Sequence, residues 1–204
     1  MVRAMADAVT DQAALLGQLD AVAGDGDHGA GISRALRTAA LSLESTPPTT
    51  PAEGLHRTGT VLIEEMGGAA GLLFGTIFTA AAKRAGTVEQ LDTSQWAEMI
   101  AVAQNAVRLR GKAQPGDRTM VDALTPAAEA LQQAASRGLE LRDAFELAAR
   151  AAAEGAEATK AMLPKQGRAR FVGERSMGHP DAGATSLSIM LKAAARCLAE
   201  QSTA

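Results

Sequence analysis

Apolar residues recur along most of the chain at the three- and four-residue spacing of α-helices, and no segment shows the sustained alternation typical of β-strands. After residue 31, for example, Ile32, Leu36, Ala39 and Leu43 would share one helix face. Polar stretches that carry glycine or proline separate the periodic segments. The pattern predicts an all-α protein with helices at about residues 1–19, 32–43, 52–65, 69–84, 92–110, 120–135, 141–162 and 187–198.

The side chains available for the core are mostly small. Apolar residues make up 47% of the 204 residues, aromatic residues only 2%, and there is no tyrosine. Alanine and leucine must therefore fill the interior, which suits closely packed helices. The segment after Gly68 is apolar on all sides as far as Lys83, as expected for a helix surrounded by others, and Gly71 and Gly75 indicate close helix–helix contact. This length suits one domain over residues 1–204.

Charge and cysteine content limit the classes of partner and the cellular location. The formal net charge of -3 argues against a general nucleic-acid binder. Cys197 is the single cysteine, which excludes an internal disulfide and fits a reducing compartment. No apolar run approaches a membrane span, and the first seven residues lack the apolar core of a signal peptide. We therefore expect a cytoplasmic protein with no nucleic-acid and no membrane partner, while a homodimer stays open.

The densest candidate chemistry lies in the stretch DAVAGDGDHGAG, from Asp20 to Gly31. Asp20, Asp25 and Asp27 would repel one another unless a cation lies among them, and carboxylates without thiolates suit Mg²⁺ or Ca²⁺ better than zinc. Glycines expose backbone N–H groups to phosphate, and the N-terminus of the following helix favours an anion. The stretch therefore predicts a metal–nucleotide site, with a solvated turn as the alternative. It fits neither the ligand spacing of an EF-hand nor the P-loop pattern.

The helix order predicts where this stretch lies relative to other polar loops. In an up-and-down array, alternate connections emerge at the same end. The acidic stretch, residues 67–71, residues 111–119 and the long loop at residues 164–181 should therefore meet at one rim. The long loop is rich in arginine, whose planar fork suits phosphate, although a solvated basic loop is the alternative. A single composite site at this rim is the expectation.

The same loops carry motifs by which the chain resembles the nucleotide-binding L subunit of dihydroxyacetone kinases. The motifs are GDGDHG from Gly24, GGAAG from Gly67, GKAQPGDRTM from Gly111, GRA from Gly167 and GERSMGHPDAGATS from Gly173. They follow the family's order and approximate spacing and span residues 20–186. The resemblance implies a single-domain antiparallel eight-helix barrel with the nucleotide at one rim, in agreement with the loop argument.

The resemblance also implies roles for individual residues. Asp20, Asp25 and Asp27 would hold two Mg²⁺ ions at the phosphates of ADP or ATP. Gly31 and Ala70 stand where relatives often carry Asn and Ser; we interpret both as changes that tune affinity, and a loss of nucleotide binding stays open. The residues expected to contact the nucleotide are His28, Gly29, Ala30, Gly31, Ala69, Ala70, Gly111, Met120, Arg168, Asp181, Ala182 and Gly183.

The implied reaction is phosphoryl transfer from the nucleotide to a hydroxyl of a small ketose, such as dihydroxyacetone or erythrulose. In this family the ketose is held by a separate K subunit, so the chain would be a kinase active only with that partner. No Ser-His-Asp or Cys-His set is evident, and we assign no catalytic base. The phosphoryl donor is either exchanging ATP or a phosphotransferase-system protein that rephosphorylates bound ADP.

Two other functions stay open from the sequence. One is a non-catalytic, nucleotide-loaded module that binds a regulator, because its loops would look the same. The other is a kinase for a protein-bound fatty acid, since alanine-rich helical barrels can hold lipid. That class is expected to come with a fused larger chain.

Overall fold

The structure, a computed structural model, describes residues 1–201, with the side chain of Gln201 excepted. In this part of the chain all regular structure is helical and no strand occurs, as the hydrophobic spacing predicts. Three short 3₁₀ helices, η1 (Thr159–Ala161), η2 (Arg168–Phe171) and η3 (Gly173–Ser176), lie before the last α-helix. The α-helices are α1 (Val2–Asp11), α2 (Ala13–Ala21), α3 (His28–Ser45), α4 (Pro51–Met66), α5 (Gly68–Ala85), α6 (Thr93–Gly111), α7 (Val121–Ser136), α8 (Leu141–Ala158) and α9 (Ala182–Gln201).

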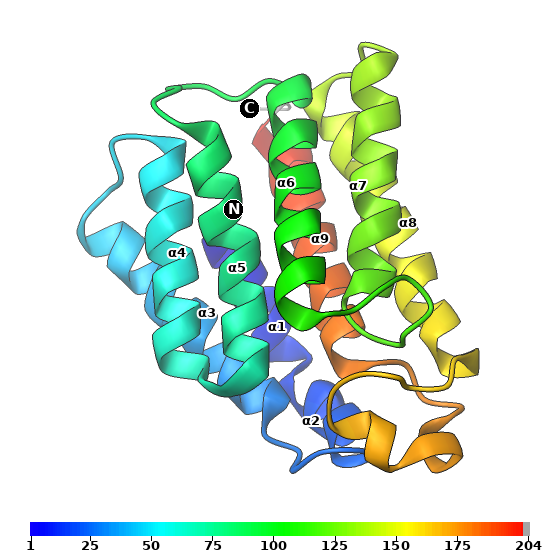
Figure 1. The fold of residues 1–204 in the computed structure, drawn as a ribbon. Helices are drawn as coiled ribbons and strands as arrows, with labels where there is room; N and C mark the ends of the chain where they lie inside the picture. The colour runs from blue at the N-terminus through cyan, green and yellow to red at the C-terminus, as the bar shows by residue number, and fades with distance from the viewer. Residues whose placement is uncertain (202–204) are drawn as a thin grey trace.

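Eight of the described helices form a closed antiparallel ring. From α3 to α9 each helix packs against the next along the chain, and α1 closes the ring by contacting both α3 and α9 (Figure 1). The short helix α2 lies at one end of the ring, where it contacts α3 and α9. The predicted eight-helix barrel is therefore confirmed, with α2 as an additional element.

The first predicted helix, at residues 1–19, is two helices. The chain bends at Gln12, whose backbone has φ -106° and ψ 7°, although neither glycine nor proline stands there. The bend directs α2 across the start of α3. At the crossing, a Cβ atom added to Gly29 would lie 2.0 Å from the carbonyl oxygen of Ala13, so only glycine fits there. A tertiary contact therefore accompanies the break, and the periodicity of the segment did not indicate it.

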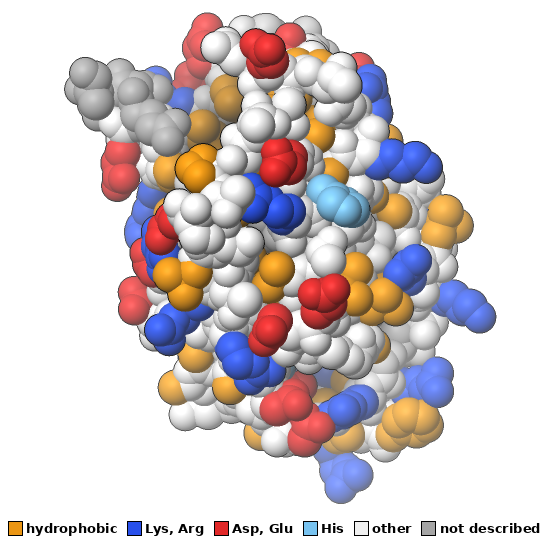
Figure 2. All heavy atoms as spheres, turned by 90° about the vertical axis from the view of Figure 1, so that its left-hand side faces the viewer, with side chains coloured by type: hydrophobic (Ala, Val, Ile, Leu, Met, Phe, Trp, Pro, Cys, Tyr) orange, Lys and Arg blue, Asp and Glu red, His pale blue; other side chains and the backbone are white. Residues whose placement is uncertain are grey.

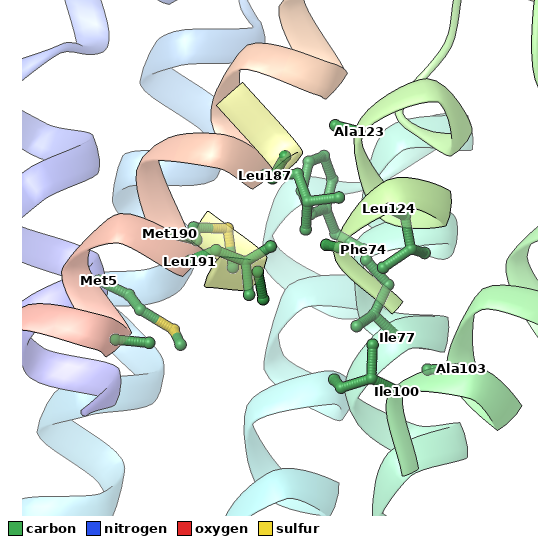
Figure 3. Close-up of a cluster of buried hydrophobic side chains, with 14 of the residues drawn as sticks. Met5, Phe74, Ile77, Ile100, Ala103, Ala123, Leu124, Leu187, Met190 and Leu191 are labelled. Atoms are coloured by element: carbon green, nitrogen blue, oxygen red, sulfur yellow. The ribbon is translucent and has the colours of Figure 1, made fainter. Parts of the chain in front are cut away.

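Small residues allow the ring to close around a packed interior. Side chains from α1, α5, α6, α7 and α9 meet at its centre, with Phe74 and Leu124 among those that are almost fully buried (Figure 3). Where α4 meets α5, a Cβ added to Gly75 would lie 2.6 Å from the carbonyl oxygen of Gly59. This contact confirms the close packing expected at Gly75. The expectation that α5 is covered on all sides holds from Phe74 to Phe78, whereas Leu72 is exposed.

Local signals set several helix ends. The predicted cap of α6 is present as a reciprocal pair: Gln95 N donates to Asp92 Oδ1 at 2.8 Å, and Asp92 N donates to Gln95 Oε1 at 2.9 Å. The same helix ends at Gly111, followed by Lys112 in the left-handed region at φ 50°. The C-terminal end of α6 fixes where the chain enters the loop between α6 and α7.

The surface of the ring carries mixed charges. On the side formed by α3 and α4, acidic and basic side chains are intermixed, and hydrophobic groups are scattered in small clusters (Figure 2). Within residues 1–201, no helix is both long enough and apolar enough to cross a membrane.

Candidate functional site

The four polar loops meet at one end of the ring, as the alternation of connections predicts. This is the lower end in Figure 1, where α2 and the three 3₁₀ helices lie. Between the loops is a cavity of about 700 Å³. Its lining comes from residues 19–34, residues 66–74, residues 107–121 and residues 166–183. Segments far apart in the sequence thus form one concave site.

One wall of the cavity is acidic. Asp20 lies in the last turn of α2, while Asp25 and Asp27 lie in the turn before α3, and each offers a carboxylate oxygen within 4.8 Å of the others. Asp20 Oδ2 also accepts a hydrogen bond from Gly26 N at 2.9 Å, which fixes the shape of the turn. Gly26 has φ 79°, a conformation that glycine adopts without strain. The fold therefore brings the three predicted metal ligands together. A site with oxygen ligands alone suits Mg²⁺.

The charges on this wall interact strongly. The Arg168 guanidinium hydrogen-bonds the Asp25 carboxylate and holds its pKa below the ordinary value. The pKa of Asp27 is raised, chiefly by its hydrogen bond with Asp25, then by burial and by the negative charges around it. Arg168 thus favours the ionised form of Asp25, whereas the negative charge of Asp25 disfavours the ionised form of Asp27. A divalent cation among the three carboxylates would offset the repulsion between them.

The N-terminus of α3 forms the floor beside the acidic wall. No side chain caps this helix, so a ligand could bind the N–H groups of its first turn. His28 lines the cavity but is buried: its Nε2 lies 2.7 Å from Ser186 Oγ, and burial lowers its pKa. Its ring centroid is 5.9 Å from that of Phe74. His28 therefore connects α3 to α9, and the backbone amides of this turn remain the groups suited to an anion.

Gly29 is the predicted nucleotide contact that is not among the cavity-lining residues. Its missing side chain is required by the crossing of α2 over α3, as described above. Ala30 and Gly31, the next two residues of the same helical turn, do line the cavity. At Gly31 an added Cβ would meet only the Met66 side chain, at 3.6 Å, so the position is open toward the cavity.

The opposite wall is largely apolar. Gly67 and Gly68 both have positive φ, 64° and 58°, and this turn starts α5 with no side-chain cap. The predicted residues Ala69, Ala70, Gly111 and Met120 line this part of the cavity. Sequence reasoning missed their apolar neighbours, because they belong to long helices whose other faces are in the core: Leu72, Leu73, Phe74 and Val107. A flat apolar group such as a nucleobase would fit this wall.

The arginine-rich loop covers one side of the cavity. We expected no structure there, but η2 and η3 lie within it, and Arg168 at the start of η2 reaches the acidic wall. Phe171 is 76% exposed, and the Arg170 guanidinium lies over its ring at 4.6 Å. Of the predicted residues, Arg168, Asp181, Ala182 and Gly183 all line the cavity.

Asp181 caps the last helix at the wall of the cavity. Its Oδ1 accepts a hydrogen bond from Ala184 N at 2.8 Å, at the start of α9. Burial raises the pKa of Asp181 to about 6, against the opposing effects of the Ala184 amide and of Arg118. This carboxyl group therefore keeps its proton to a higher pH than an exposed aspartate does.

Arg118 is a cavity-lining residue that sequence reasoning did not single out. It lies in the GKAQPGDRTM motif, but a charged residue in a polar loop is usually exposed, and its burial at 4% exposure has no signal in the sequence. The other polar groups missed were Arg34, Arg110, Thr119 and Gln166, which also line the cavity.

Comparisons of the chain with known proteins agree on one family. The model of the DAK2 domain matches residues 22–196. The ADP-binding subunit DhaL of the PEP-dependent dihydroxyacetone kinase of Escherichia coli is 36% identical over 186 residues, which cover 91% of this chain and 89% of that protein. The D-erythrulose kinase of Mycolicibacterium smegmatis is 39% identical over 197 residues, which cover 96% of this chain and 34% of that protein.

The fold agrees with a solved structure. The dihydroxyacetone kinase of C. freundii in complex with AMP-PNP and Mg²⁺ superposes with a TM-score of 0.74 at 29% identity, covering 96% of this chain and 33% of that one. The chain thus spans about a third of the erythrulose kinase and of this solved kinase.

Proposed function

Because the chain belongs to the family of DAK2 domains, we propose that it is the nucleotide-binding part of a kinase that phosphorylates a small ketose. The observation that carries the proposal is the cavity itself. Three carboxylates suited to Mg²⁺, two helix N-termini without side-chain caps and a set of apolar side chains line it. A magnesium–nucleotide complex needs these three kinds of surface together.

Different residues of the cavity would bind the metal, the phosphates and the nucleoside. Asp20, Asp25 and Asp27 would hold Mg²⁺, in two sites by resemblance to the family, and the metal supplies charge neutralisation for phosphoryl transfer. Amides at the start of α3 would donate to phosphate oxygens, because they point out of a helix N-terminus. Met120, Ala69, Ala70 and Gly111 would contact the nucleoside.

Arg168 and the start of α9 would close the site over the nucleotide. Arg168 now pairs with Asp25, and a phosphate group would offer it a second anionic partner. Ala182 and Gly183 expose the first turn of α9 to the cavity beside Asp181. Gly31 and Ala70 would contact the nucleotide through backbone groups, because neither has a side chain that hydrogen-bonds.

The ketose would bind outside residues 1–204, which we propose form one nucleotide-binding domain. In the described residues the one imidazole–hydroxyl pair at the cavity, His28 with Ser186, has its hydroxyl fully buried, and Ser186 does not line the cavity. This chain would therefore supply the half of the site that holds the phosphates. The other half would be a ketose-binding K subunit or a further part of a longer chain, since the erythrulose kinase and the C. freundii kinase are about three times as long. The donor would be exchanging ATP or a phosphotransferase-system protein acting on bound ADP. We place the protein in the cytoplasm, where both nucleotides are available.

A reconstitution experiment tests this function. Phosphorylation of dihydroxyacetone and of erythrulose is measured with the chain alone, with a candidate K subunit alone and with both, using ATP or a phosphotransferase chain as donor. We expect product only when both proteins are present. Phosphorylation by the isolated chain would place the ketose site here. ADP binding with no transfer in any mixture would favour the non-catalytic module.

A further inference from the structure

Arg118 lies in a loop that is braced on both sides of it. The Asp122 carboxylate accepts hydrogen bonds from Gly116 N and from Thr119 N, the latter at 2.8 Å. Between these two anchors, Arg118 has φ 60°, a left-handed conformation that is costly for a residue with a side chain. The loop therefore holds this arginine in one orientation at a cost in backbone energy.

The guanidinium of Arg118 binds a different loop. Nη1 donates to Ser176 Oγ and Nη2 to the Ser176 carbonyl oxygen, both at 2.5 Å. Nη2 also donates to the carbonyl oxygen of His179 at 2.8 Å. Ser176 ends η3 and His179 lies two residues before Asp181, so these contacts hold the segment that leads into α9.

The partners of Arg118 are unusual for a buried charge. Its side chain hydrogen-bonds a hydroxyl and two backbone carbonyl oxygens, whereas a buried arginine is normally paired with a carboxylate. Burial lowers the pKa of Arg118, and the charge of Asp181 opposes that effect. Its Nε is buried and has no hydrogen-bond partner among the described residues. A buried arginine without a carboxylate partner lowers the stability of the fold. A role in the adjacent cavity would explain its presence there.

We propose that Arg118 is a positioning residue for the nucleotide: it clasps residues 176–179 to the loop between α6 and α7, and thereby fixes Asp181, Ala182 and Gly183 at the cavity wall. This inference rests on the proposed function. The far end of the clasped segment is held as well, because Asp181 N donates to Thr159 Oγ1 at 2.8 Å. With both ends fixed, the N-terminus of α9 keeps one position relative to Met120, whose side chain lies 3.6 Å from a Cβ added to Gly183.

The test compares Arg118→Lys with Arg108→Lys. Lysine keeps the charge but cannot span three acceptors as a planar fork does. Arg108 is the matched control, because its guanidinium hydrogen-bonds the Gln114 side chain of the same loop and it does not line the cavity. Hydrogen exchange is followed at Met177, Gly178 and Asp181, whose amides are hydrogen-bonded in the structure. ADP affinity with Mg²⁺ is measured on the same samples.

Arg118→Lys should speed exchange at these three amides and weaken ADP binding by about tenfold, while exchange in the ring helices stays as in the wild type. Arg108→Lys should change neither. In the reconstituted kinase, Arg118→Lys should raise KM for ATP more than it lowers kcat. A merely structural role would instead lower kcat at unchanged KM, because fewer molecules would be folded.

If Arg118→Lys does not fold, Ser176→Ala removes one of the three acceptors and should shift the same amides and the ADP affinity in the same direction, by less. Wild-type exchange and wild-type ADP affinity in folded Arg118→Lys, or in folded Ser176→Ala, would overturn the clasp. Failure of the wild type itself to bind ADP would instead overturn the proposed function, so the two failures are distinguishable.

Discussion

At the scale of single residues, the acidic wall concentrates charge that the protein itself neutralises only in part. Asp20, Asp25 and Asp27 lie together, and Arg168 is the cation that pairs with one of them in the described structure. Two of these carboxylates are exposed, so the ion pair with Arg168 adds little stability. Such a cluster is therefore better explained by a bound cation than by folding.

Removal of either exposed carboxylate should abolish nucleotide binding without unfolding the protein. We expect Asp25→Ala and Asp27→Ala to lose measurable ADP binding, because the proposed Mg²⁺ site would lose one of its carboxylate ligands. Their helical circular dichroism should match the wild type. Glu129→Ala, which removes an exposed carboxylate from α7, is the control and should bind ADP normally. Unchanged, metal-independent ADP binding in both aspartate variants would show that the acidic loop is a solvated turn and holds no metal.

A second prediction at this scale concerns Asp181 and pH. Its pKa in the folded protein is about 6, above the ordinary 3.8, so the folded state binds this proton more tightly than the unfolded state does. The ionised carboxyl group therefore costs up to about 3 kcal/mol above pH 6, and the cost disappears as the pH falls through 6 toward 4.

Asp181→Asn keeps an oxygen to cap α9 but removes this titration. In urea unfolding, the free energy of the variant should exceed that of the wild type by more at about pH 7.5 than at about pH 5. A difference between the two proteins that does not change with pH would show that the Asp181 carboxyl group is not protonated in this range.

At the scale of elements, the ring depends on glycines that have no room for a side chain. A Cβ at Gly75 would lie 2.4 Å from a side-chain carbon of Ile63 and 2.6 Å from the Gly59 carbonyl oxygen. Because backbone lies on one side, α4 and α5 would have to move apart.

Gly75→Ala should therefore lower the free energy of unfolding by about 1–3 kcal/mol. Gly31→Ala is the matched control, since it also lies within a helix but would meet only Met66 at 3.6 Å. It should raise stability by about 0.5–1 kcal/mol, through the higher helix propensity of alanine. Urea unfolding measures both, and equal effects of the two substitutions would contradict the packing assigned to α4 and α5.

The elements also show what could be predicted from the sequence. The spacing of Ile32, Leu36 and Ala39 and the Asp92–Gln95 cap located their helices, because these signals are local. The bend at Gln12 had no local signal, since it accompanies the crossing of α2 over Gly29. The turns η2 and η3 were missed for the same reason: tertiary contacts such as those of Arg118 with Ser176 hold this segment.

At the scale of the whole molecule, ring closure turns four separate loops into one cavity. The order of the helices predicted this convergence, because alternate connections share an end. The residues predicted as ligands of the metal and nucleotide followed from motif positions, and most of them line the cavity. Burial of His28 and Arg118 could not be predicted, because it depends on contacts with α9 and with the segment before it.

The exposed basic edge of the rim should matter for transfer to the ketose rather than for nucleotide binding. Arg175 is exposed in η3 and does not line the cavity. Arg175→Ala should lower phosphoryl transfer with a K subunit by about tenfold, because a rim charge that meets the partner is lost, while ADP affinity stays near the wild-type value. Arg150→Ala, an exposed arginine on α8, is the control. Equal losses of ADP affinity and of phosphoryl transfer would indicate that Arg175 contacts the nucleotide.

The central claim is that this cavity binds a nucleotide through a metal held by Asp20, Asp25 and Asp27. Calorimetric titration of the chain with ADP, in Mg²⁺ and again in EDTA, tests it most directly. We predict saturable binding of one ADP per chain in Mg²⁺ and no measurable binding in EDTA. No binding to the folded protein in Mg²⁺, or the same affinity in EDTA, would contradict the claim.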